Sequence, residues 1–398
     1  MGIKLGLFFG GKSVEHEVSI ISALQAANAF DKQKYEIVPL YISKSGACYT
    51  GGDLLKIEEY RDIPALLNKS QQVILVNENG VCSLLRYPFK RFGSPVVGSI
   101  DLAFPVVHGT NVEDGALQGY LKTLGVPFAG CDVTASAMGM DKFAMKTVLK
   151  ENHIPVLDCR KIHIKEYYGA PAAILATLES AFSYPVICKP LNLGSSIGIQ
   201  KAANSTELTA ALEYAFQFAN TALVEPAIVS LKEINCAVLG DRNQVKISEC
   251  EEPVNTDAIL SYQDKYMAQG KTGAGSKGMS GAKRIIPANI SPEMREKVRT
   301  LAGATFQALD CNGVARIDFL LDTATDTLYV NEINTIPGSL SFYLWEPVGL
   351  TYTALLDEIV DLAWARERAN REISYSFDTS ILTQFQGGGL KGYKTGPQ

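Results

Sequence analysis

VNEINTIPGSLSFYLWEP, residues 330–347, begins with two oxygen-bearing side chains at the end of an apolar, strand-like run. Glu332 and Asn334 are two residues apart, and alternate side chains of a strand point to the same face, so both groups share one side. The strand-like segment GVARIDFLL places Arg316 and Asp318 on one face in the same way. Side by side, Asp318, Glu332 and Asn334 would form an all-oxygen site suited to Mg²⁺, completed by phosphate oxygens and water.

Arg316 would lie beside this site as a fixed positive fork for a developing negative charge. A surface salt-bridge cluster is the alternative, but the two strands are too apolar for a solvated face. The aromatic residues that follow, Phe342, Tyr343 and Trp345, either extend the same site or pack in a core.

The composition is that of a globular protein of two or three domains, because 398 residues with 46% apolar side chains bury sizeable cores. The net charge of -5 contains no long block of one sign, which argues against nucleic acid or an anionic membrane as the main partner. No stretch has the apolar run of a signal peptide or a membrane span, so we expect a cytoplasmic protein. The eight cysteines and four histidines are too scattered for a zinc site, and we interpret the cysteines as reduced core residues.

Strand and helix patterns divide the chain into three parts. We predict an N-terminal α/β domain over residues 1–138, doubly wound with a mainly parallel sheet. A small central α+β lobe follows over 139–230, and a mostly antiparallel C-terminal lobe over 231–370. Within the third part, the Gly-, Ser- and Lys-rich segment 267–284 cannot hold a core and is expected to be a mobile loop. The tail 371–398 is expected to be loosely ordered for the same reason.

A phosphate-loop pattern stands near the N-terminus, where Gly6, Gly11, Lys12 and Ser13 fit GxxxxGK[ST] letter for letter. The residues between the two glycines are typical of a buried strand and not of a loop that wraps phosphates. We therefore interpret the segment as a glycine turn that leads into a helix. At the C-terminal end of a parallel strand, such a turn could present Glu15 to a cleft.

A second glycine turn, HGTNVEDGALQG, brings His108, Glu113 and Asp114 together. It is equally well explained as a capped helix start, with the two acidic residues at the positive end of the helix. Spacing alone does not decide between a functional turn and a structural one.

Two lysines stand where an ammonium needs an anion. Lys142 is expected to open a helix, and Lys189 ends the apolar strand VICKP, where burial without a counter-ion would cost several kcal/mol. A polyphosphate would supply that counter-ion. The next segment, LNLGSSIGIQK, carries Gly194, Ser195 and Ser196 in a loop that could fold over phosphates, although a simple hairpin turn explains it as well.

Taken together, the segments MDK, CKP, LGSSIGI, the KY of residues 265–266, RID and NEINTIPG resemble the ATP-grasp fold. With HEVS and HGxxxEDGxLQG they resemble the D-alanyl-D-alanine ligase family, in the family's order and over nearly the whole chain. The resemblance implies an ATP-dependent ligase that joins two D-alanines through an acyl phosphate, in the synthesis of peptidoglycan precursors for the cell wall. It implies ATP and two Mg²⁺ ions, with Mn²⁺ as an alternative, and amino-acid substrates without nucleic acid or membrane partners. We also expect a homodimer.

The resemblance implies a role for individual residues. One set matches positions that hold ATP and its metal ions: the phosphate-binding Lys142 and Lys189, the carboxylates Glu225 and Glu233 around adenine and ribose, and the metal ligands Asp318, Glu332 and Asn334. The other set matches positions around the amino acids: Glu15 for the ammonium of the first D-alanine, Ser195 and Tyr266 hydrogen-bonded with it, His108 beside the substrates, Arg316 at the tetrahedral species, the Gly338 N–H as oxyanion donor, and Lys265 with Tyr266 in the closing lid.

Three departures from the family pattern are visible. Val112 stands where the glycine of HGxxGEDG is usual, and the lid from Tyr266 to Pro287 is longer than expected. The third concerns the serine that binds the carboxylate of the second D-alanine, because an ungapped match puts Tyr343 in its place.

The acceptor pocket is therefore open to interpretation. Either the Tyr343 hydroxyl binds the acceptor carboxylate, or Ser341 or Ser339 turns inward to do so. The first alternative function is the same chemistry with another acceptor, for example D-serine. A phosphate-loop NTPase and a non-catalytic nucleotide-binding protein on the same fold are the others, and the intact set of matched residues argues against the last.

Overall fold

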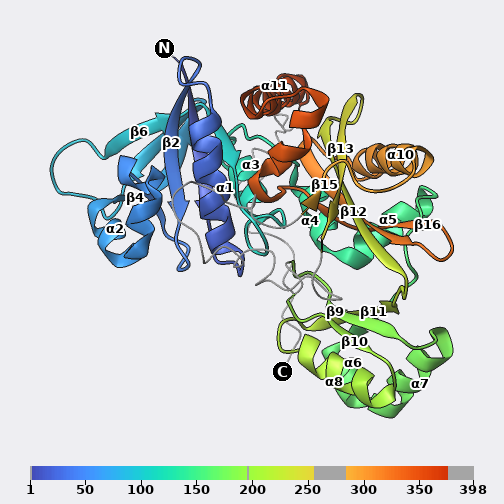
Figure 1. Cartoon of the computed structure of the whole chain (residues 1–398). Helices are drawn as coiled ribbons and strands as arrows, with labels where there is room; N and C mark the ends of the chain where they lie inside the picture. Colours follow the sequence, from blue (N-terminus) through green and yellow to red (C-terminus); the bar gives the residue numbers. More distant parts are fainter. Residues whose placement is uncertain (1, 195–196, 255–283, 375–398) are drawn as a thin grey trace, which may run out of the picture.

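The computed structural model describes residues 2–194, 197–254 and 284–374, which form three β-sheets (Figure 1). The segment 267–284 that we expect to be mobile lies outside the described residues except for Arg284, and so does the tail from residue 375 onward. The sheets contain seven, four and five strands, in that order along the chain. This agrees with the predicted succession of an N-terminal α/β part, a small central lobe and a C-terminal antiparallel lobe.

The N-terminal sheet has the strand order β6-β5-β4-β3-β2-β1-β7 and is mixed. Only β2, β1 and β7 run parallel, and the other pairs are antiparallel. The predicted parallel arrangement thus holds for these three strands and not for the rest. Its strands are β1 (Ile3–Gly10), β2 (Tyr35–Ile42), β3 (Cys48–Thr50), β4 (Gln71–Glu78), β5 (Val81–Arg86), β6 (Val96–Ile100) and β7 (Leu102–Pro105).

Helix α1 (His16–Ala29) begins after the glycine turn that ends β1 and packs on that strand. At Gly10 the backbone has φ of 88°, and a Cβ atom there would lie 2.3 Å from the carbonyl oxygen of Ile42, so the turn requires glycine. The remaining helical segments of this part are η1 (Gly52–Leu55), η2 (Ile57–Arg61), α2 (Ile63–Lys69) and α3 (Ala116–Thr123).

The central sheet is antiparallel, with the order β10-β9-β11-β8, and lies lowest in Figure 1. Its apolar side chains form a small core of their own with those of α6, α7 and α8. The elements are β8 (Arg160–His163), α6 (Ile164–Gly169), α7 (Pro171–Ala181), β9 (Val186–Pro190), β10 (Gln200–Ala202), α8 (Ser205–Ala215) and β11 (Thr221–Pro226).

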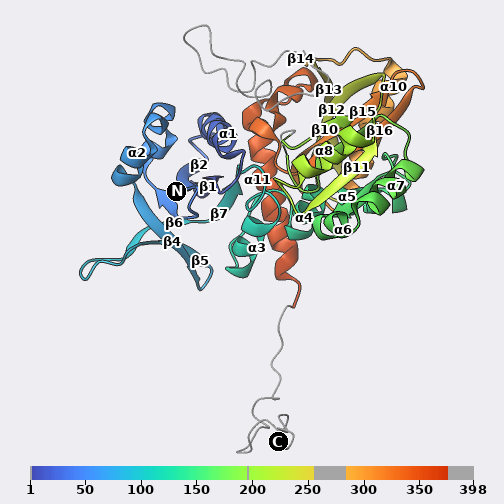
Figure 2. The same cartoon turned by 90° about the horizontal axis from the view of Figure 1, so that it is seen from below.

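The C-terminal sheet, β14-β13-β12-β15-β16, is antiparallel and is covered by helices α10 and α11. Alternate residues of β12 pack into two different cores: Cys236 and Val238 with α10, and Ala237 and Leu239 with α11. Helix α11 also packs against α1, so it joins the C-terminal sheet to the N-terminal part (Figure 2). The elements are β12 (Leu231–Gly240), β13 (Val245–Pro253), β14 (Arg284–Ile285), α10 (Pro292–Ala308), β15 (Gly313–Asp322), β16 (Thr327–Asn334), η4 (Gly338–Leu344), η5 (Glu346–Val348) and α11 (Tyr352–Arg371).

Helices α4 (Val133–Met140) and α5 (Lys142–Glu151) link the N-terminal sheet to the central one. Met145 and Leu149 of α5 belong to the buried cluster of the C-terminal sheet, although the sequence pattern assigns this helix to the central lobe. The domain limits at 138, 230 and 370 stay a prediction. The packing of α5 matters for the site because this helix carries Lys142 against the C-terminal sheet.

All eight cysteines are free thiols and all but Cys48 are buried, as expected of reduced core residues. Across the described ranges, no helix is both long enough and apolar enough to cross a membrane.

Candidate active site

The predicted oxygen ligands lie on two neighbouring strands. β15 and β16 pair antiparallel with Asp318 opposite Glu332 and Arg316 opposite Asn334. Arg316 donates from Nε to Asp318 Oδ1 at 2.6 Å and from Nη2 to Oδ2 at 2.7 Å, and Asn334 Nδ2 donates to Oδ2 at 3.1 Å. Burial opposes the charge on Arg316, but the Asp318 carboxylate outweighs it and raises the pKa of the guanidinium. The four side chains therefore lie together, as strand periodicity predicts, while their roles stay predictions.

A β-bulge brings a further side chain to this face. The pairing passes from Asp318–Glu332 directly to Phe319–Val330, which leaves Asn331 as an extra residue in β16. An extra residue breaks the alternation of side chains, and the buried positions of β16 accordingly change parity at this point. Asn331 and Glu332 are both half-buried and face the same side of the sheet.

Lys142 connects the oxygen cluster to the central lobe. It is the first residue of α5, capped by Asp141, and its side chain is almost completely buried. Its Nζ donates to the carbonyl oxygen of Leu193 at 2.9 Å and lies 3.3 Å from Glu332 Oε2. The ammonium thus stands between the loop after β9 and the predicted metal ligands.

Lys189 has its anion within the protein. Its Nζ lies 2.5 Å from Glu225 Oε1 and 3.2 Å from Asn331 Oδ1, and Lys146 Nζ lies 2.6 Å from the other oxygen of Glu225. Burial opposes the ionisation of Glu225, but the two ammonium groups outweigh it and lower its pKa to about 2. The sequence predicts a polyphosphate as the counter-ion of Lys189, and in this structure Glu225 provides one. A role of Glu225 beside adenine and ribose stays a prediction.

Glu15 lies at the meeting point of three loops. The residue is buried at the N-terminus of α1. A Cβ atom at Gly109, in the turn after β7, would lie 2.8 Å from Glu15 Oε2, and one at Gly194, in the loop after β9, would lie 2.9 Å from the same oxygen. Both loops therefore approach Glu15 closely because they carry glycine there. Ser195, which is predicted to bond with Glu15, lies outside the described residues.

His108 is tied to the end of β16 and to α1. Its Nδ1 lies 2.8 Å from the carbonyl oxygen of Ile336 and its Nε2 lies 3.1 Å from Ser22 Oγ. Complete burial lowers the pKa of His108 to about 4, so the ring is neutral at pH 7. A carbonyl oxygen only accepts, so Nδ1 carries the proton and Nε2 accepts from the Ser22 hydroxyl. The Ser22 oxygen in turn accepts from the N–H of Ser339 at 2.9 Å, so the Ser22 hydroxyl donates to His108 and accepts from Ser339.

Glu113 also binds the backbone of Ile336, through the N–H and not the carbonyl. Its Oε1 accepts from the N–H of Ile336 at 3.0 Å and its Oε2 from the N–H of Gly109 at 2.9 Å. Burial, with the charge of Glu15 as the next cause, raises the pKa of Glu113 to about 8. The turn after β7 thus bonds to both the N–H and the carbonyl of Ile336, which makes it an interdomain contact and more than a helix cap.

A left-handed turn precedes the aromatic residues. Ser339, Leu340 and Ser341 have φ of 51°, 53° and 50°, values that residues with a side chain adopt rarely. Ser339 Oγ donates to Gln25 Oε1 at 2.5 Å. Ser341 is completely buried, and its hydroxyl has no hydrogen-bond partner among the described residues.

The aromatic residues then divide between site and core. Tyr343 OH donates to Glu251 Oε1 at 3.2 Å, and the guanidinium of Arg284 lies 3.9 Å from the centre of the Tyr343 ring. Burial and Glu251 raise the pKa of Tyr343 to about 12. Phe342 instead stacks on Tyr352 at 4.5 Å, and Trp345 is buried in the N-terminal core. Of the two interpretations of this stretch, the site therefore fits Tyr343 and core packing fits Phe342 and Trp345.

The remaining predicted residues are placed as follows. Glu233 is half-buried near the start of β12, opposite Leu320 of β15, and Gly338 begins η4. Lys265 and Tyr266 lie outside the described residues, so the predicted lid has no structural account here.

The phosphate-loop pattern is not a loop. Gly6 and the residues up to Gly10 form β1, and Leu7, Phe8 and Phe9 are buried in the core. Lys12 follows in the turn and is exposed. The interpretation as a strand followed by a glycine turn is confirmed.

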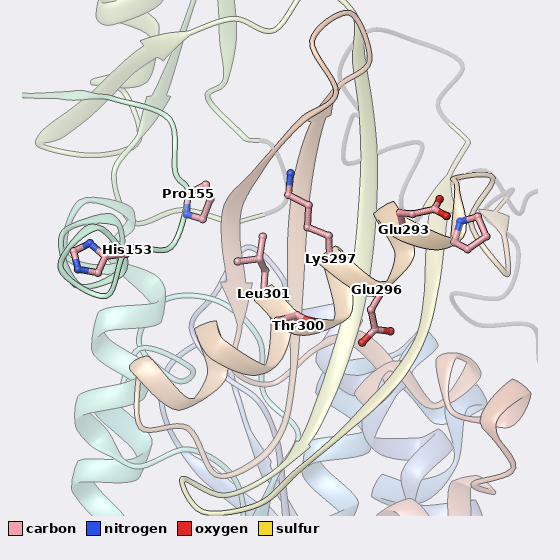
Figure 3. Close-up of a pocket in the computed structure, with 8 residues that line it drawn as sticks. His153, Pro155, Glu293, Glu296, Lys297, Thr300 and Leu301 are labelled. Atoms are coloured by element: carbon pink, nitrogen blue, oxygen red, sulfur yellow. The ribbon is translucent and has the colours of Figure 1, made fainter.

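A surface hollow of about 750 Å³ lies elsewhere, beside α10 (Figure 3). Its lining includes His153, Glu293, Glu296 and Lys297, and none of the predicted site residues takes part. Figure 3 shows Glu296 and Lys297 pointing in different directions, so the hollow does not bring a set of ligand groups together.

A mixed N-terminal sheet followed by a small and a larger antiparallel sheet is the arrangement of the ATP-grasp ligase fold. Comparison with known proteins identifies the kind of ligase. Residues 4–131 match the family described as "D-ala D-ala ligase N-terminus" and residues 148–361 match "D-ala D-ala ligase C-terminus". The chain belongs to the D-alanine–D-alanine ligase family and is an ATP-dependent ligase.

Individual relatives agree with this assignment. The chain is 38% identical to the D-alanine–D-alanine ligase of Thermosipho melanesiensis over 96% of this chain and 98% of the relative. The solved D-alanine–D-alanine ligase of Coxiella burnetii superposes with a TM-score of 0.78 at 28% identity, over 93% of this chain and 96% of that one. The VanG D-Ala:D-Ser ligase of Enterococcus faecalis superposes with a TM-score of 0.73 at 28% identity, over 91% and 100%.

Four residues of the site are not predicted from the sequence: Ser22, Lys146, Glu251 and Asn331. Lys146 follows Lys142 by one helical turn, so helical periodicity places both on one face and could have indicated it. Asn331 interrupts the apolar alternation of its strand, a signal of a bulge. Ser22 and Glu251 have no comparable signal, because their partners lie far away in the sequence.

Proposed function

We propose that this protein uses ATP to join two D-alanines into D-alanyl-D-alanine, a precursor of peptidoglycan. The observation that carries the proposal is the convergence of three kinds of group: the ammonium of Lys142, the cluster of Asp318, Glu332 and Asn334, and the Glu15 carboxylate. Lys142 touches both the cluster and the loop that approaches Glu15. A nucleotide and a small amino acid would therefore meet at this point.

The cluster suits Mg²⁺ by the chemistry of its donors. Asp318, Glu332 and Asn334 offer carboxylate and amide oxygens, the ligands that Mg²⁺ takes together with phosphates. Among the described residues, no three Asp, Glu, His or Cys side chains form a metal site by themselves. Mg²⁺ held there would neutralise charge on the triphosphate. Two ions, or Mn²⁺ in their place, stay a prediction.

In the first step, a carboxylate oxygen of the first D-alanine attacks the γ-phosphorus of ATP, the bond to ADP breaks and an acyl phosphate forms. Lys142 and Lys189 would hold the phosphates and offset the charge that develops on them. Glu15 would bind the substrate ammonium. Its carboxylate lies where the loops that carry Gly109 and Gly194 meet, and this position beside the loop after β9 supports the role.

In the second step, the free amine of the second D-alanine attacks the acyl carbon to give a tetrahedral species. The C–O bond to phosphate then breaks, and the leaving phosphate takes up the proton that the amine nitrogen loses. Arg316, fixed by its two bonds to Asp318, and the N–H of Gly338 would stabilise the oxyanion. His108 would hold the backbone that carries this donor. Water has to be excluded because it would hydrolyse the acyl phosphate, and Lys265 and Tyr266 are proposed as parts of the closing lid.

For the acceptor carboxylate we favour Tyr343 over Ser341. Tyr343 is half-buried, and Arg284 lies over its ring and 3.6 Å from the Glu251 carboxylate, so this place already accommodates a carboxylate beside a cation. The Ser341 hydroxyl is completely enclosed, so a ligand could reach it only if the turn opened. Because a tyrosine stands where the family has a serine, a related acceptor such as D-serine is the second candidate. The homodimer stays a prediction.

The test is phosphate release from ATP measured against D- and L-amino acids, singly and in pairs, with products identified by mass spectrometry. D-Alanine alone should support full turnover and yield the dipeptide. If turnover required D-serine beside D-alanine, the second candidate would replace the first. ATP hydrolysis that ignored all amino acids would contradict the ligase assignment of this site.

A further inference from the structure

The carboxylate of Glu225, on β11, is shared by Lys146 of α5 and Lys189 of β9. Lys146 lies 2.6 Å from Oε2 and Lys189 lies 2.5 Å from Oε1. The side chains of Lys146, Glu225 and Lys189 are only 2%, 3% and 4% exposed. We call these three residues the buried triad.

The buried triad carries one more positive than negative charge. Burying an unbalanced charge is costly, so a protein keeps one where a ligand balances it. Glu225 stays ionised throughout the neutral range because its pKa is lowered to about 2. Burial lowers the pKa of the Lys146 ammonium, and the Glu225 carboxylate opposes this shift. With both lysines protonated, the excess is one ammonium, which matches an incoming anion.

The two lysines differ in their second hydrogen-bond partners. The second partner of Lys146 is the carbonyl oxygen of Leu157, at 3.2 Å. The second partner of Lys189 is Asn331, the bulge residue that faces the same side as the predicted metal ligand Glu332. Lys189 therefore borders the ATP site, whereas Lys146 stands on the inner side of Glu225.

From this arrangement we infer that Lys146 is a positioning residue for ATP binding: it keeps Glu225 paired, so that Lys189 can leave Glu225 for a phosphate of the nucleotide. Without Lys146, Lys189 and Glu225 would form a closed one-to-one pair. Binding of ATP would then leave a buried carboxylate alone, which is strongly unfavourable. The inference rests on the proposed function only in taking ATP as the ligand of Lys189.

The main variant is Lys146→Gln, which removes the charge but keeps a hydrogen-bond donor. Affinity for ATP is measured calorimetrically with Mg²⁺ and without amino acids, so the identity of the substrates does not enter. We expect the Kd of Lys146→Gln to rise at least about tenfold, because a buried ion pair has to be broken. Lys146→Arg keeps the charge, so its Kd for ATP should stay within about threefold of the wild-type Kd. This is well below the tenfold change that corresponds to about 1.4 kcal/mol.

Lys150→Gln is the matched control. Lys150 lies one turn further along α5, and its exposed side chain pairs with Asp158 at 2.5 Å on the surface. Its loss removes the same charge from the same helix and should leave the Kd for ATP nearly unchanged, because an exposed pair contributes little. Melting temperatures of all variants show whether a change in Kd accompanies a general loss of stability.

A double-mutant cycle separates action through Glu225 from direct attraction of phosphate. In a Glu225→Gln background there is no carboxylate to keep paired, so Lys146→Gln should then change the Kd less than about twofold, which would show that the two residues are coupled. An equal loss in both backgrounds would overturn the inference, as would a folded Lys146→Gln protein with wild-type affinity or a Lys146→Arg protein as weak as the Gln variant. Wild-type protein that binds no ATP would contradict the proposed function itself, before any variant is compared.

Discussion

Replacing Ser22 by alanine tests whether the contact between α1 and the turn after β16 serves catalysis. Ser22 is completely buried, and its hydroxyl donates to His108 and accepts from the N–H of Ser339. Ser22→Ala removes one oxygen atom and leaves both partners without a bond. The N–H of Ser339 is one residue from Gly338, the proposed oxyanion donor, so the position of that donor depends on this bond.

The expected size follows from the number of bonds lost. Each buried group left without a partner costs about 1 to 3 kcal/mol, so the two together cost about 2 to 6 kcal/mol. Complete loss of one oxyanion donor lowers kcat by about 10² to 10³. Because Ser22→Ala displaces the donor and does not remove it, we expect kcat to fall on the order of 10- to 100-fold, with part of the cost appearing as lower stability.

The assay is D-alanine-dependent phosphate release at saturating ATP, with kcat and KM for D-alanine obtained together and the melting temperature measured in parallel. Ser19→Ala is the control. Ser19 lies one turn earlier on α1, is equally buried, accepts from the N–H of Gly10 at 2.8 Å and donates to the carbonyl of Val106 at 2.6 Å. It should lose comparable stability with a much smaller change in kcat.

The reasoning would be refuted if Ser22→Ala and Ser19→Ala lowered the melting temperature alike and both kept a wild-type kcat. The bond from Ser22 to Ser339 would then be structural only, and the placement of Gly338 would have another cause.

Three further predictions can be checked with the same protein. Glu332→Gln should abolish amino-acid-dependent ATP turnover while circular dichroism shows an intact fold, and near-normal turnover would contradict the metal assignment. Lys12→Ala should keep its affinity for ATP because Lys12 lies in an exposed turn. Tyr343→Phe should raise the KM of the second amino acid by the equivalent of roughly 1 to 3 kcal/mol, the cost of one lost hydrogen bond to a charge, and should leave the affinity for ATP unchanged. Ser341→Ala should change neither quantity. The reverse pattern would move the acceptor contact to Ser341. Burial lowers the pKa of His108 from 6.5 to about 4 in the folded protein, so between these pH values the unfolded chain binds more protons than the folded one. The free energy of unfolding should therefore fall by about 3 kcal/mol as the pH drops from 6.5 to 4. A His108→Asn variant with the same pH dependence would exclude His108 as the cause.

Periodicity within a strand is what made the oxygen cluster predictable from the sequence. Asp318, Glu332 and Asn334 were brought together by alternation alone, once two adjacent strands were expected to pair. The paired register in the structure, with Asp318 opposite Glu332, is the simplest arrangement of those strands. The succession of three lobes followed likewise from local patterns of helix and strand.

Pairing between distant segments is what local patterns could not supply. Glu113 meets Ile336, and Lys146 meets Glu225, only after the sheets have formed. The mixed character of the N-terminal sheet does have a local signal, the Asn79–Gly80 pair. Asn79 and Gly80 both have positive φ in the tight turn between β4 and β5, and an Asn-Gly pair between apolar runs is typical of an antiparallel hairpin.

The bulge at Asn331 joins the predictable part of the site to the unpredictable part. Without it, Asn331 and Glu332 would face opposite sides of β16, and Lys189 would lose its contact with the strand that carries the metal ligands. The inserted residue thus places Asn331, the partner of Lys189, beside Glu332, the partner of Lys142, although the two lysines come from different elements. Bulges recur next to active sites because they re-aim a side chain without disturbing the rest of the sheet. In this chain the re-aimed side chain borders both the buried triad and the oxygen cluster, so the position of Lys189 and that of the predicted metal are set by the same local distortion of β16.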